Sequence, residues 1–192
     1  AAFCLFAGLL PGVAPGGPRS HGSGRPSHSF VHTQNSYVFE GRFAARADLD
    51  CLLHIFYDYE HFTALMTHVE DIHLERKGVA WYEVSYTYRT FFYTAVSTFR
   101  RTLDLAGCRV LDELVRVRQS GIVTPEIHSI RGHYQMIPGK DGVEVTFYQE
   151  GRMTAGLLGG FYFRFAEREA AAFMARVKVY AEAVCRGGGS GP

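Results

Sequence analysis

The segment FYFRFAEREAAAFMARVKVYAEAVC, residues 161–185, decides the fold, because the period of the sequence changes there. Its apolar residues, Phe173, Met174 and Val177 among them, recur at helical spacing, whereas the residues before it follow the alternating pattern of strands. Charged residues take the remaining positions, and Gly187 follows the end of the pattern. The segment predicts a long amphipathic helix that must bury its apolar side against another element.

The residues upstream predict a series of β-strands. In the first of them, Tyr37, Phe39 and Phe43 share one face and alternate with residues of the other face. In the segment PGKDG, residues 138–142, Pro presets a turn and Gly and Asp tolerate positive φ angles, which indicates a hairpin. Residues 108–119 fit a helix and a strand equally well, and we assign a strand because strands flank them. The predicted strands cover residues 36–44, 69–76, 79–89, 91–103, 108–119, 126–137 and 142–153.

Short helices are expected after the first strand. Asp48 is a suitable N-cap, and residues 49–66 carry apolar positions that fit one or two helices with a bend near residues 58–62. The order of elements is then strand, short helices, several strands and a long helix. Short turns between consecutive strands indicate antiparallel pairing. We predict an α+β domain in which a curved antiparallel sheet wraps around a long C-terminal α-helix.

Three short strings carry a resemblance to a known family. They are DYEHF at residues 58–62, GHYQMIP at 132–138 and DGVEVTF at 141–147. On these strings and the order of elements, the chain resembles the START-like superfamily of polyketide cyclase/dehydrase and lipid-transport proteins (SRPBCC, helix-grip fold), nearest to its polyketide cyclase and coenzyme-Q-binding branch. The resemblance spans most of residues 36–186, and Tyr134 stands where the family usually has Trp.

The two ends of the chain are expected to lie outside this domain, which we assign to residues 36–186. Residues 1–14 resemble the apolar core of a secretory signal peptide, and a fragment of a membrane anchor is the alternative. Residues 15–35 predict a flexible linker, and residues 187–192 predict a disordered tail. A signal peptide would direct the protein to the periplasm or out of the cell, and without one we expect a cytoplasmic location.

Composition excludes some partners. The 192 residues are 47% hydrophobic and 20% charged, which is typical of a globular chain, and the net charge of +1 gives no basic surface for nucleic acid. Transient contact with a membrane is compatible with the resemblance.

The cysteines form no CxxC pair and are widely spaced, so we expect buried structural thiols, without a zinc site or a disulfide framework. These cysteines are Cys4, Cys51, Cys108 and Cys185.

The resemblance implies that an apolar molecule, such as a lipid, a quinone or a polyketide, binds between the sheet and the C-terminal helix. Such pockets are lined by apolar groups with a few polar anchors. Tyrosines are informative because a buried hydroxyl needs a partner, although each inward residue also suits an ordinary core. The residues predicted to face the ligand are Phe39, Phe43, Tyr82, Val84, Tyr86, Ile130, Tyr134, Val145, Phe147, Phe165, Phe173, Met174 and Val177.

The sequence contains no evident catalytic constellation or cofactor motif. His54 and His61 could share a helix face, but a bend separates them, and their spacing matches no established metal site. Glu83, Arg131 and His133 could transfer protons only if they faced inward, whereas the strand pattern places them outward. We therefore expect no metal, no cofactor and no catalytic residue.

Binding or transport of a small hydrophobic ligand is the main function hypothesis, and enzymatic activity is less favoured. The first alternative is a cyclase- or aromatase-like enzyme that acts on a polyketide-type substrate. The second is an interaction module with a filled core, which an exposed apolar patch near residues 157–163 would support.

Overall fold

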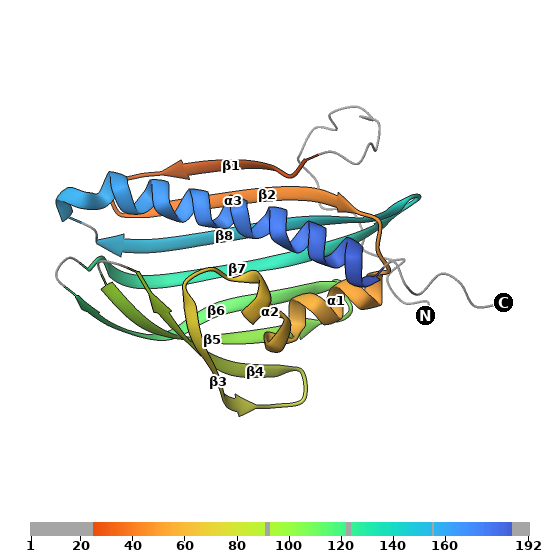
Figure 1. Cartoon of the computed structure of the whole chain (residues 1–192), viewed down its shortest axis with the longest axis horizontal. Helices are drawn as coiled ribbons and strands as arrows, with labels where there is room; N and C mark the ends of the chain where they lie inside the picture. The colour runs from red at the N-terminus through yellow and green to blue at the C-terminus, as the bar shows by residue number, and fades with distance from the viewer. Residues whose placement is uncertain (1–24, 91–92, 122–123, 155, 186–192) are drawn as a thin grey trace.

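A single antiparallel sheet and a long helix across one of its faces make up the fold (Figure 1). The computed structural model describes residues 25–90, 93–121, 124–154 and 156–185. Within them the sheet has eight strands in the order β1-β2-β8-β7-β6-β5-β4-β3. The predicted α+β helix-grip arrangement is therefore confirmed.

The chain enters the sheet at one edge, crosses to the other through two helices, and returns strand by strand. The strands are β1 (Ser27–His32), β2 (Ser36–Ala45), β3 (Val69–Lys77), β4 (Trp81–Arg89), β5 (Tyr93–Asp104), β6 (Arg109–Gly121), β7 (Glu126–Gly139) and β8 (Gly142–Thr154). The helices are α1 (Leu49–Tyr57), α2 (Tyr59–Leu65), the 3-10 turn η1 (Gly156–Leu158) and α3 (Gly159–Val184).

Strand β1 corrects part of the predicted linker 15–35. Residues 27–32 form an edge strand that pairs with β2 along its whole length. Two histidines of this strand also pack on aromatic rings, since His28 stacks on Phe39 and His32 stacks on Phe163. Backbone pairing with β2 holds this strand in place. Most of its side chains stay exposed, so the sequence needs no alternating apolar pattern here.

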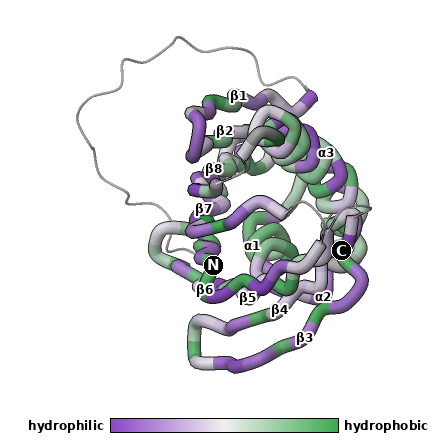
Figure 2. Tube along the Cα trace, turned by 90° about the vertical axis from the view of Figure 1, so that its left-hand side faces the viewer, coloured by the Kyte–Doolittle hydropathy of each residue, from purple (hydrophilic) through white to green (hydrophobic). Residues whose placement is uncertain are grey.

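The sheet bends so that all helices lie on its inner side (Figure 2). As predicted, the Asp48 side chain caps α1, accepting hydrogen bonds from the backbone N–H groups of Asp50 and Cys51. The bend between the helices falls at Asp58, which caps the start of α2 in turn by accepting from the Glu60 N–H group at 2.9 Å. These caps fix the directions of α1 and α2 over the sheet.

The predicted hairpin is formed by β7 and β8, with Gly139 opposite Gly142. Gly142 has a φ angle of 139°, and a side chain there would collide with the backbone of Ala45. Glycine is needed at this position on both counts. The turn fixes the register that directs Tyr134 and Phe147 to the same inner face.

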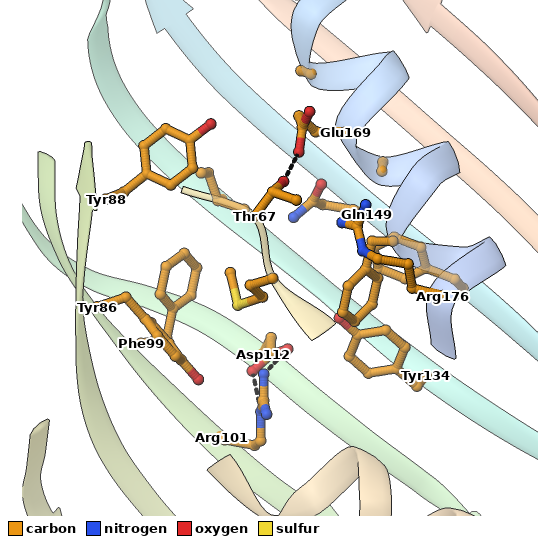
Figure 3. A pocket seen from close by; sticks show the side chains of 16 residues that line it. Thr67, Tyr86, Tyr88, Phe99, Arg101, Asp112, Tyr134, Gln149, Glu169 and Arg176 are labelled. Carbon is orange, nitrogen blue, oxygen red and sulfur yellow. Dashed lines mark hydrogen bonds and ion pairs between the residues drawn. The ribbon is translucent and has the colours of Figure 1, made fainter. Parts of the chain in front are cut away.

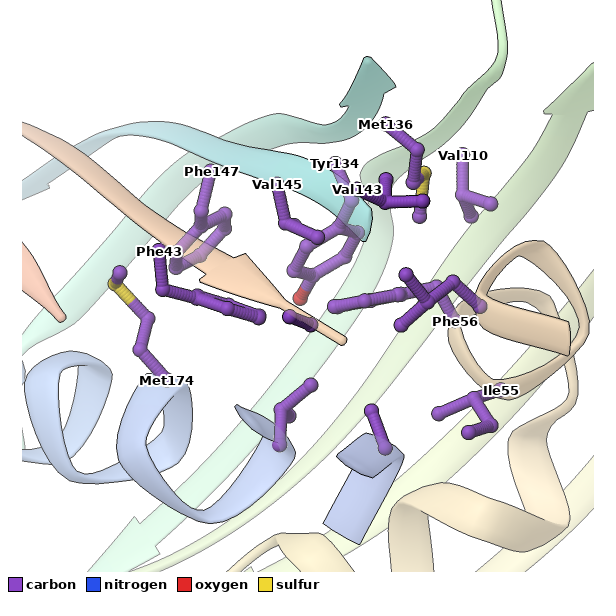
Figure 4. Close-up of a cluster of buried hydrophobic side chains, with 14 of the residues drawn as sticks. Phe43, Ile55, Phe56, Val110, Tyr134, Met136, Val143, Val145, Phe147 and Met174 are labelled. Atoms are coloured by element: carbon purple, nitrogen blue, oxygen red, sulfur yellow. The ribbon is translucent and has the colours of Figure 1, made fainter. Parts of the chain in front are cut away.

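Helix α3 lies on the inner face along β2, at the side of the sheet farthest from β3 (Figure 1). It approaches closely at Gly41, where a side chain would overlap with Met174. Strands and helices then enclose one main core, seen in Figure 4, which combines Phe43, Phe56 and Val145 with residues of α3. Burial of this apolar surface is the dominant force that holds the helix to the sheet.

A disulfide bond joins Cys51 of α1 to Cys185 at the end of α3, with a Cα–Cα distance of 5.9 Å. The prediction of structural thiols without disulfides was therefore wrong for this pair. The two residues are 134 positions apart in the sequence, and they meet because the C-terminal end of α3 lies against the first turn of α1.

The remaining predictions for the ends fall on residues 1–24 and 186–192, outside the described residues. Within the described part of the chain, none of the helices is both long and apolar enough to cross a membrane.

Candidate functional site

A cavity of about 290 Å³ lies between the inner face of the sheet and α3 (Figure 3). Aromatic and aliphatic side chains make up most of its wall, and a few polar groups enter at its two ends. Its lining consists of Met66, Thr67, Tyr86, Tyr88, Phe99, Arg101, Asp112, Ile130, Tyr134, Phe147, Gln149, Ala166, Glu169, Ala170, Phe173 and Arg176.

The structure brings only part of the predicted ligand-facing set to this cavity. Those that line it are Tyr86, Ile130, Tyr134, Phe147 and Phe173. The others pack in the core or between elements and are absent from its lining: Phe39, Phe43, Tyr82, Val84, Val145, Phe165, Met174 and Val177. Period-two alternation placed Tyr86, Tyr134 and Phe147 on the face that lines the cavity, but it carries no information on how far along a strand the cavity begins.

The floor of the cavity holds a buried ion pair that the sequence analysis did not anticipate. The Arg101 guanidinium donates to both carboxylate oxygens of Asp112, at 2.7 and 2.9 Å, and also to the Phe56 carbonyl at 3.3 Å. Its side chain is only 3% exposed. Burial alone would lower the pKa of Arg101, but the nearby Asp112 carboxylate outweighs that effect and raises it. Arg101 is therefore a fixed positive charge inside the domain.

Strand register explains why these charges face inward. Arg101 on β5 pairs with Tyr82 on β4 and with Asp112 on β6, so all three point to the same face. A usable signal was present in the sequence, since Arg101 lies two positions after the apolar Phe99 in a period-two strand. A charge at an inward position is uncommon without a partner, so it marks either a functional or a structural ion pair.

The hydroxyl group of Tyr86 is the unusual polar atom of the site. The side chain is 4% exposed, and its oxygen has no hydrogen-bond partner among the described residues. Figure 3 shows the ring extending from β4 toward the floor of the cavity. Burial raises the pKa of Tyr86 to about 12, so the phenol stays protonated at neutral pH. A buried hydroxyl without a partner costs free energy, and a bound molecule with an acceptor could satisfy it.

The opposite end of the cavity is closed by contacts to α3. Thr67, directly after α2 and Met66, donates a short hydrogen bond to Glu169 of α3, drawn as a dashed line in Figure 3. Arg176 of α3 donates to the Leu65 carbonyl at 2.7 Å. These contacts hold the segment after α2 against α3, and they place the Glu169 carboxylate and the Arg176 guanidinium in the wall of the cavity.

One wall is a stack of aromatic rings. The Tyr134 ring stacks on Phe147, with ring centroids 4.8 Å apart. The Phe56 ring also packs on Tyr134, with a centroid distance of 4.6 Å. Phe173 of α3 approaches both Tyr134 and Phe147. Tyr134 occupies the predicted inward position, but it also belongs to the main core, so it contributes to stability as well as to the cavity.

The acidic and basic residues assigned to the outer face do lie away from the cavity. Glu83 accepts hydrogen bonds from Arg76 and Arg100, Arg131 pairs with Glu150, and His133 stacks on a tyrosine at 5.4 Å. None of them is part of the cavity lining. Burial and the nearby Arg109 lower the pKa of His133.

Among the lining residues described, the carboxylates are already engaged. Asp112 is held by Arg101, and Glu169 accepts from Thr67. Burial, followed by the charge of Asp112, raises the pKa of Tyr134 well above its ordinary value. The phenols therefore act as neutral donors or acceptors at neutral pH, which suits recognition of a ligand better than abstraction of a proton.

No protein-family model and no curated protein matches the sequence. Solved structures, by contrast, match over most of their length. Zhui aromatase/cyclase from Streptomyces sp. R1128 has a TM-score of 0.65 at 15% identity, covering 81% of this chain and 99% of that one. A STAR-related lipid transfer protein from Xanthomonas axonopodis has a TM-score of 0.61 at 11% identity, covering 82% and 99%. The chain has the START-like fold.

A further START-like neighbour is norcoclaurine synthase from Thalictrum flavum, solved with dopamine and hydroxybenzaldehyde. It has a TM-score of 0.59 at 12% identity, covering 82% of this chain and 98% of that one. At these identities the likeness concerns the START-like fold alone, because one fold carries many functions. The function has to be argued from the cavity itself.

Proposed function

We propose that the chain binds a small hydrophobic ligand in the cavity between the sheet and α3. The observation that carries this proposal is the combination of an aromatic wall with a buried hydroxyl group, that of Tyr86, which lacks a partner among the described residues. A mostly apolar cavity with a few oriented polar groups is the usual form of a small-molecule site. Its presence argues against an interaction module with a filled core.

The size of the cavity limits the ligand. An apolar cavity of about 150 Å³ accommodates benzene, and this one has about 290 Å³. A compact molecule with about two rings fits that space, whereas a long acyl chain would have to extend out of the cavity. Among lipid, quinone and polyketide-like ligands, the cavity therefore favours a compact ring compound.

The Tyr86 hydroxyl group, near the Arg101–Asp112 pair, suggests that the ligand has an oxygen atom at its buried end. The Tyr86 hydroxyl group can donate to a carbonyl or hydroxyl oxygen of the ligand, because its pKa keeps it protonated. Aromatic rings such as those of Tyr134 and Phe147 would stack on the ring system. The proposed ligand is thus an aromatic or quinoid molecule with at least one oxygen substituent at its buried end.

A cyclase-like enzyme is the second candidate function. It is favoured by the position of the Tyr86 hydroxyl near the Arg101–Asp112 pair, where a donor and a fixed charge could polarise a ligand carbonyl. It is disfavoured because the carboxylates among the described lining residues already have partners. The binding function needs no such group and is the better supported of the two.

Export and transient membrane contact are also part of the proposal. The Cys51–Cys185 disulfide supports an oxidising compartment, since disulfides are rare in the cytosol. The exposed apolar residues Leu158 and Phe161, 42% and 47% exposed at the start of α3, support a brief contact with a membrane or a carrier.

A competition experiment tests the binding proposal. An environment-sensitive fluorescent probe bound to the protein would be titrated with phenol, 2-naphthol and an eighteen-carbon fatty acid. We expect 2-naphthol to displace the probe at lower concentration than either of the other compounds. Equal potency of all three would contradict a shaped cavity, and failure of all three to compete would contradict the proposed function.

A further inference from the structure

Three side chains of types that can bind metals lie close together at the junction of α1 and α2, outside the cavity. His54 lies in the last turn of α1, Asp58 separates the helices, and His61 lies in α2. One ligand atom from each of these residues lies within 4.8 Å of the other two. The bend that argued against a shared site in the sequence is therefore the feature that brings the histidines together.

The two carboxylate oxygens of Asp58 have different neighbours. Oδ1 accepts from the backbone N–H of Glu60 at 2.9 Å, which fixes the carboxylate at the start of α2. Oδ2 faces His54, with 3.8 Å between it and the imidazole Nε2 atom. The rings of His54 and His61 meet edge to face, with centroids 5.4 Å apart. The backbone thus holds one oxygen and leaves the other facing the histidines.

His61 has a supporting contact from α3. Its Nδ1 atom lies 2.7 Å from the hydroxyl group of Tyr180. A neutral imidazole carries one proton, so donation from Nδ1–H to the tyrosine oxygen leaves the lone pair of Nε2 available for a cation. Metal-binding histidines almost always have such a partner on the nitrogen that does not bind the ion.

We propose that His54, Asp58 and His61 bind a divalent transition-metal ion, for which zinc suits the donor set best. Two imidazoles and one carboxylate match the three protein ligands of an open zinc site, in which water takes the fourth position. Nitrogen donors favour zinc, nickel or copper over magnesium or calcium.

The site needs only a small adjustment to hold the ion. Ligand atoms around a tetrahedral zinc ion are roughly 3.4 Å apart, given bonds of about 2.1 Å. The side chain of His54 is 67% exposed and can rotate toward the other ligands without disturbing the core. The bound ion would connect α1 to α2 and, through Tyr180, to α3. None of these residues belongs to the cavity lining, so the metal site is independent of the ligand proposal.

Cobalt provides a direct test, because Co²⁺ replaces zinc and absorbs visible light when coordinated. The metal-free full chain would be titrated with Co²⁺ and then with Zn²⁺, which should displace the cobalt. We expect one Co²⁺ per chain. Tyr180→Phe should weaken Co²⁺ binding by about 10- to 100-fold, the usual effect of losing such a supporting contact. His54→Ala and Asp58→Asn, which remove ligands, should weaken it by more than Tyr180→Phe does.

Matched variants keep this test specific. Asn still caps a helix, so Asp58→Asn should fold normally, and His54 is too exposed for its loss to unfold the domain. His73, an exposed residue of β3, serves as the control, and His73→Ala should bind Co²⁺ like the wild type. Absence of saturable Co²⁺ binding by the wild type would overturn the proposal. Unchanged affinity in folded His54→Ala would also overturn it, because the ion would then occupy another part of the chain.

Discussion

Arg101 and Asp112, on neighbouring strands β5 and β6, form a two-bond ion pair at the floor of the cavity, with N–O distances of 2.7 and 2.9 Å. The Arg101 side chain is 3% exposed and that of Asp112 is 15% exposed. Both charges are therefore largely removed from water and depend on each other.

Breaking this pair from one side should destabilise the domain strongly. We expect Arg101→Met to lower the free energy of unfolding by about 3–5 kcal/mol, because it leaves the Asp112 carboxylate buried without its counter-charge. The double variant Arg101→Met/Asp112→Leu should recover part of this loss. Urea unfolding measures both values, and additive losses in the double variant would contradict the mutual dependence.

Removing the Tyr86 hydroxyl group should separate ligand binding from stability. Tyr86→Phe keeps the ring and deletes an oxygen that has no partner among the described residues. We expect the free energy of unfolding to stay the same or rise, and affinity for an oxygen-bearing ring compound to fall by roughly 3- to 10-fold. Titration calorimetry with 2-naphthol checks the affinity. Equal affinity for the two proteins would show that the hydroxyl does not contact the ligand.

The Cys51–Cys185 disulfide should contribute substantially to stability, since it closes a loop of 134 residues. Chain-entropy arguments assign such a link about 2–5 kcal/mol, which corresponds to a fall in Tm of roughly 5–15 °C for a domain of this size. The test is thermal unfolding of the double variant Cys51→Ala/Cys185→Ala. A Tm equal to that of the oxidised wild type would contradict the expected role.

Acid should weaken the domain through Glu83. Hydrogen bonds from Arg100 and Arg76 hold the pKa of Glu83 below its ordinary value of 4.5. A carboxyl whose pKa is lowered on folding stabilises the protein above the unfolded-state pKa, and the contribution disappears as pH falls through the folded-state pKa. Stability should therefore decline from about pH 5 downward.

The variant Glu83→Gln isolates that contribution. Its free energy of unfolding at pH 7 should be about 1 kcal/mol lower than that of the wild type, and its decline in acid should be shallower. Urea unfolding at several pH values checks this, with Glu126→Gln as the control because the Glu126 side chain is 75% exposed. Parallel pH profiles for Glu83→Gln and the wild type would count against the ion-pair assignment.

The fold was predictable because local rules agree along the chain. Asp48 caps α1 as expected, the helices break at Asp58, and the turn at residues 138–142 sets the hairpin register. Strand β1 was not predictable from apolar alternation, since its backbone pairs at an edge while its side chains remain mostly exposed. The disulfide depends on the contact between the start of α1 and the end of α3, which sequence spacing does not reveal.

The sequence predicted which face of the sheet carries the site, but not which residues of that face line the cavity. Alternation placed Tyr86, Tyr134 and Phe147 on the inner face, where they line the cavity. It placed Phe39 and Val145 there too, but these residues fill the core next to the cavity. The Arg101–Asp112 pair arises from the register of neighbouring strands, which is a tertiary property.

Native mass spectrometry of protein purified from its own host tests the central claim most directly. The matched variants are Ala170→Phe, at a lining position of α3, and Ala175→Phe, at an exposed position of the same helix. We predict about one small molecule per chain in the wild type and in Ala175→Phe, and a nearly empty Ala170→Phe protein, because the added ring fills the cavity.

Circular dichroism confirms that each variant is folded. Extraction of the bound molecule should then yield a compact ring compound with an oxygen substituent. A folded Ala170→Phe protein that carries the same ligand at the same occupancy would contradict the account. So would an empty wild-type protein that also fails to bind 2-naphthol.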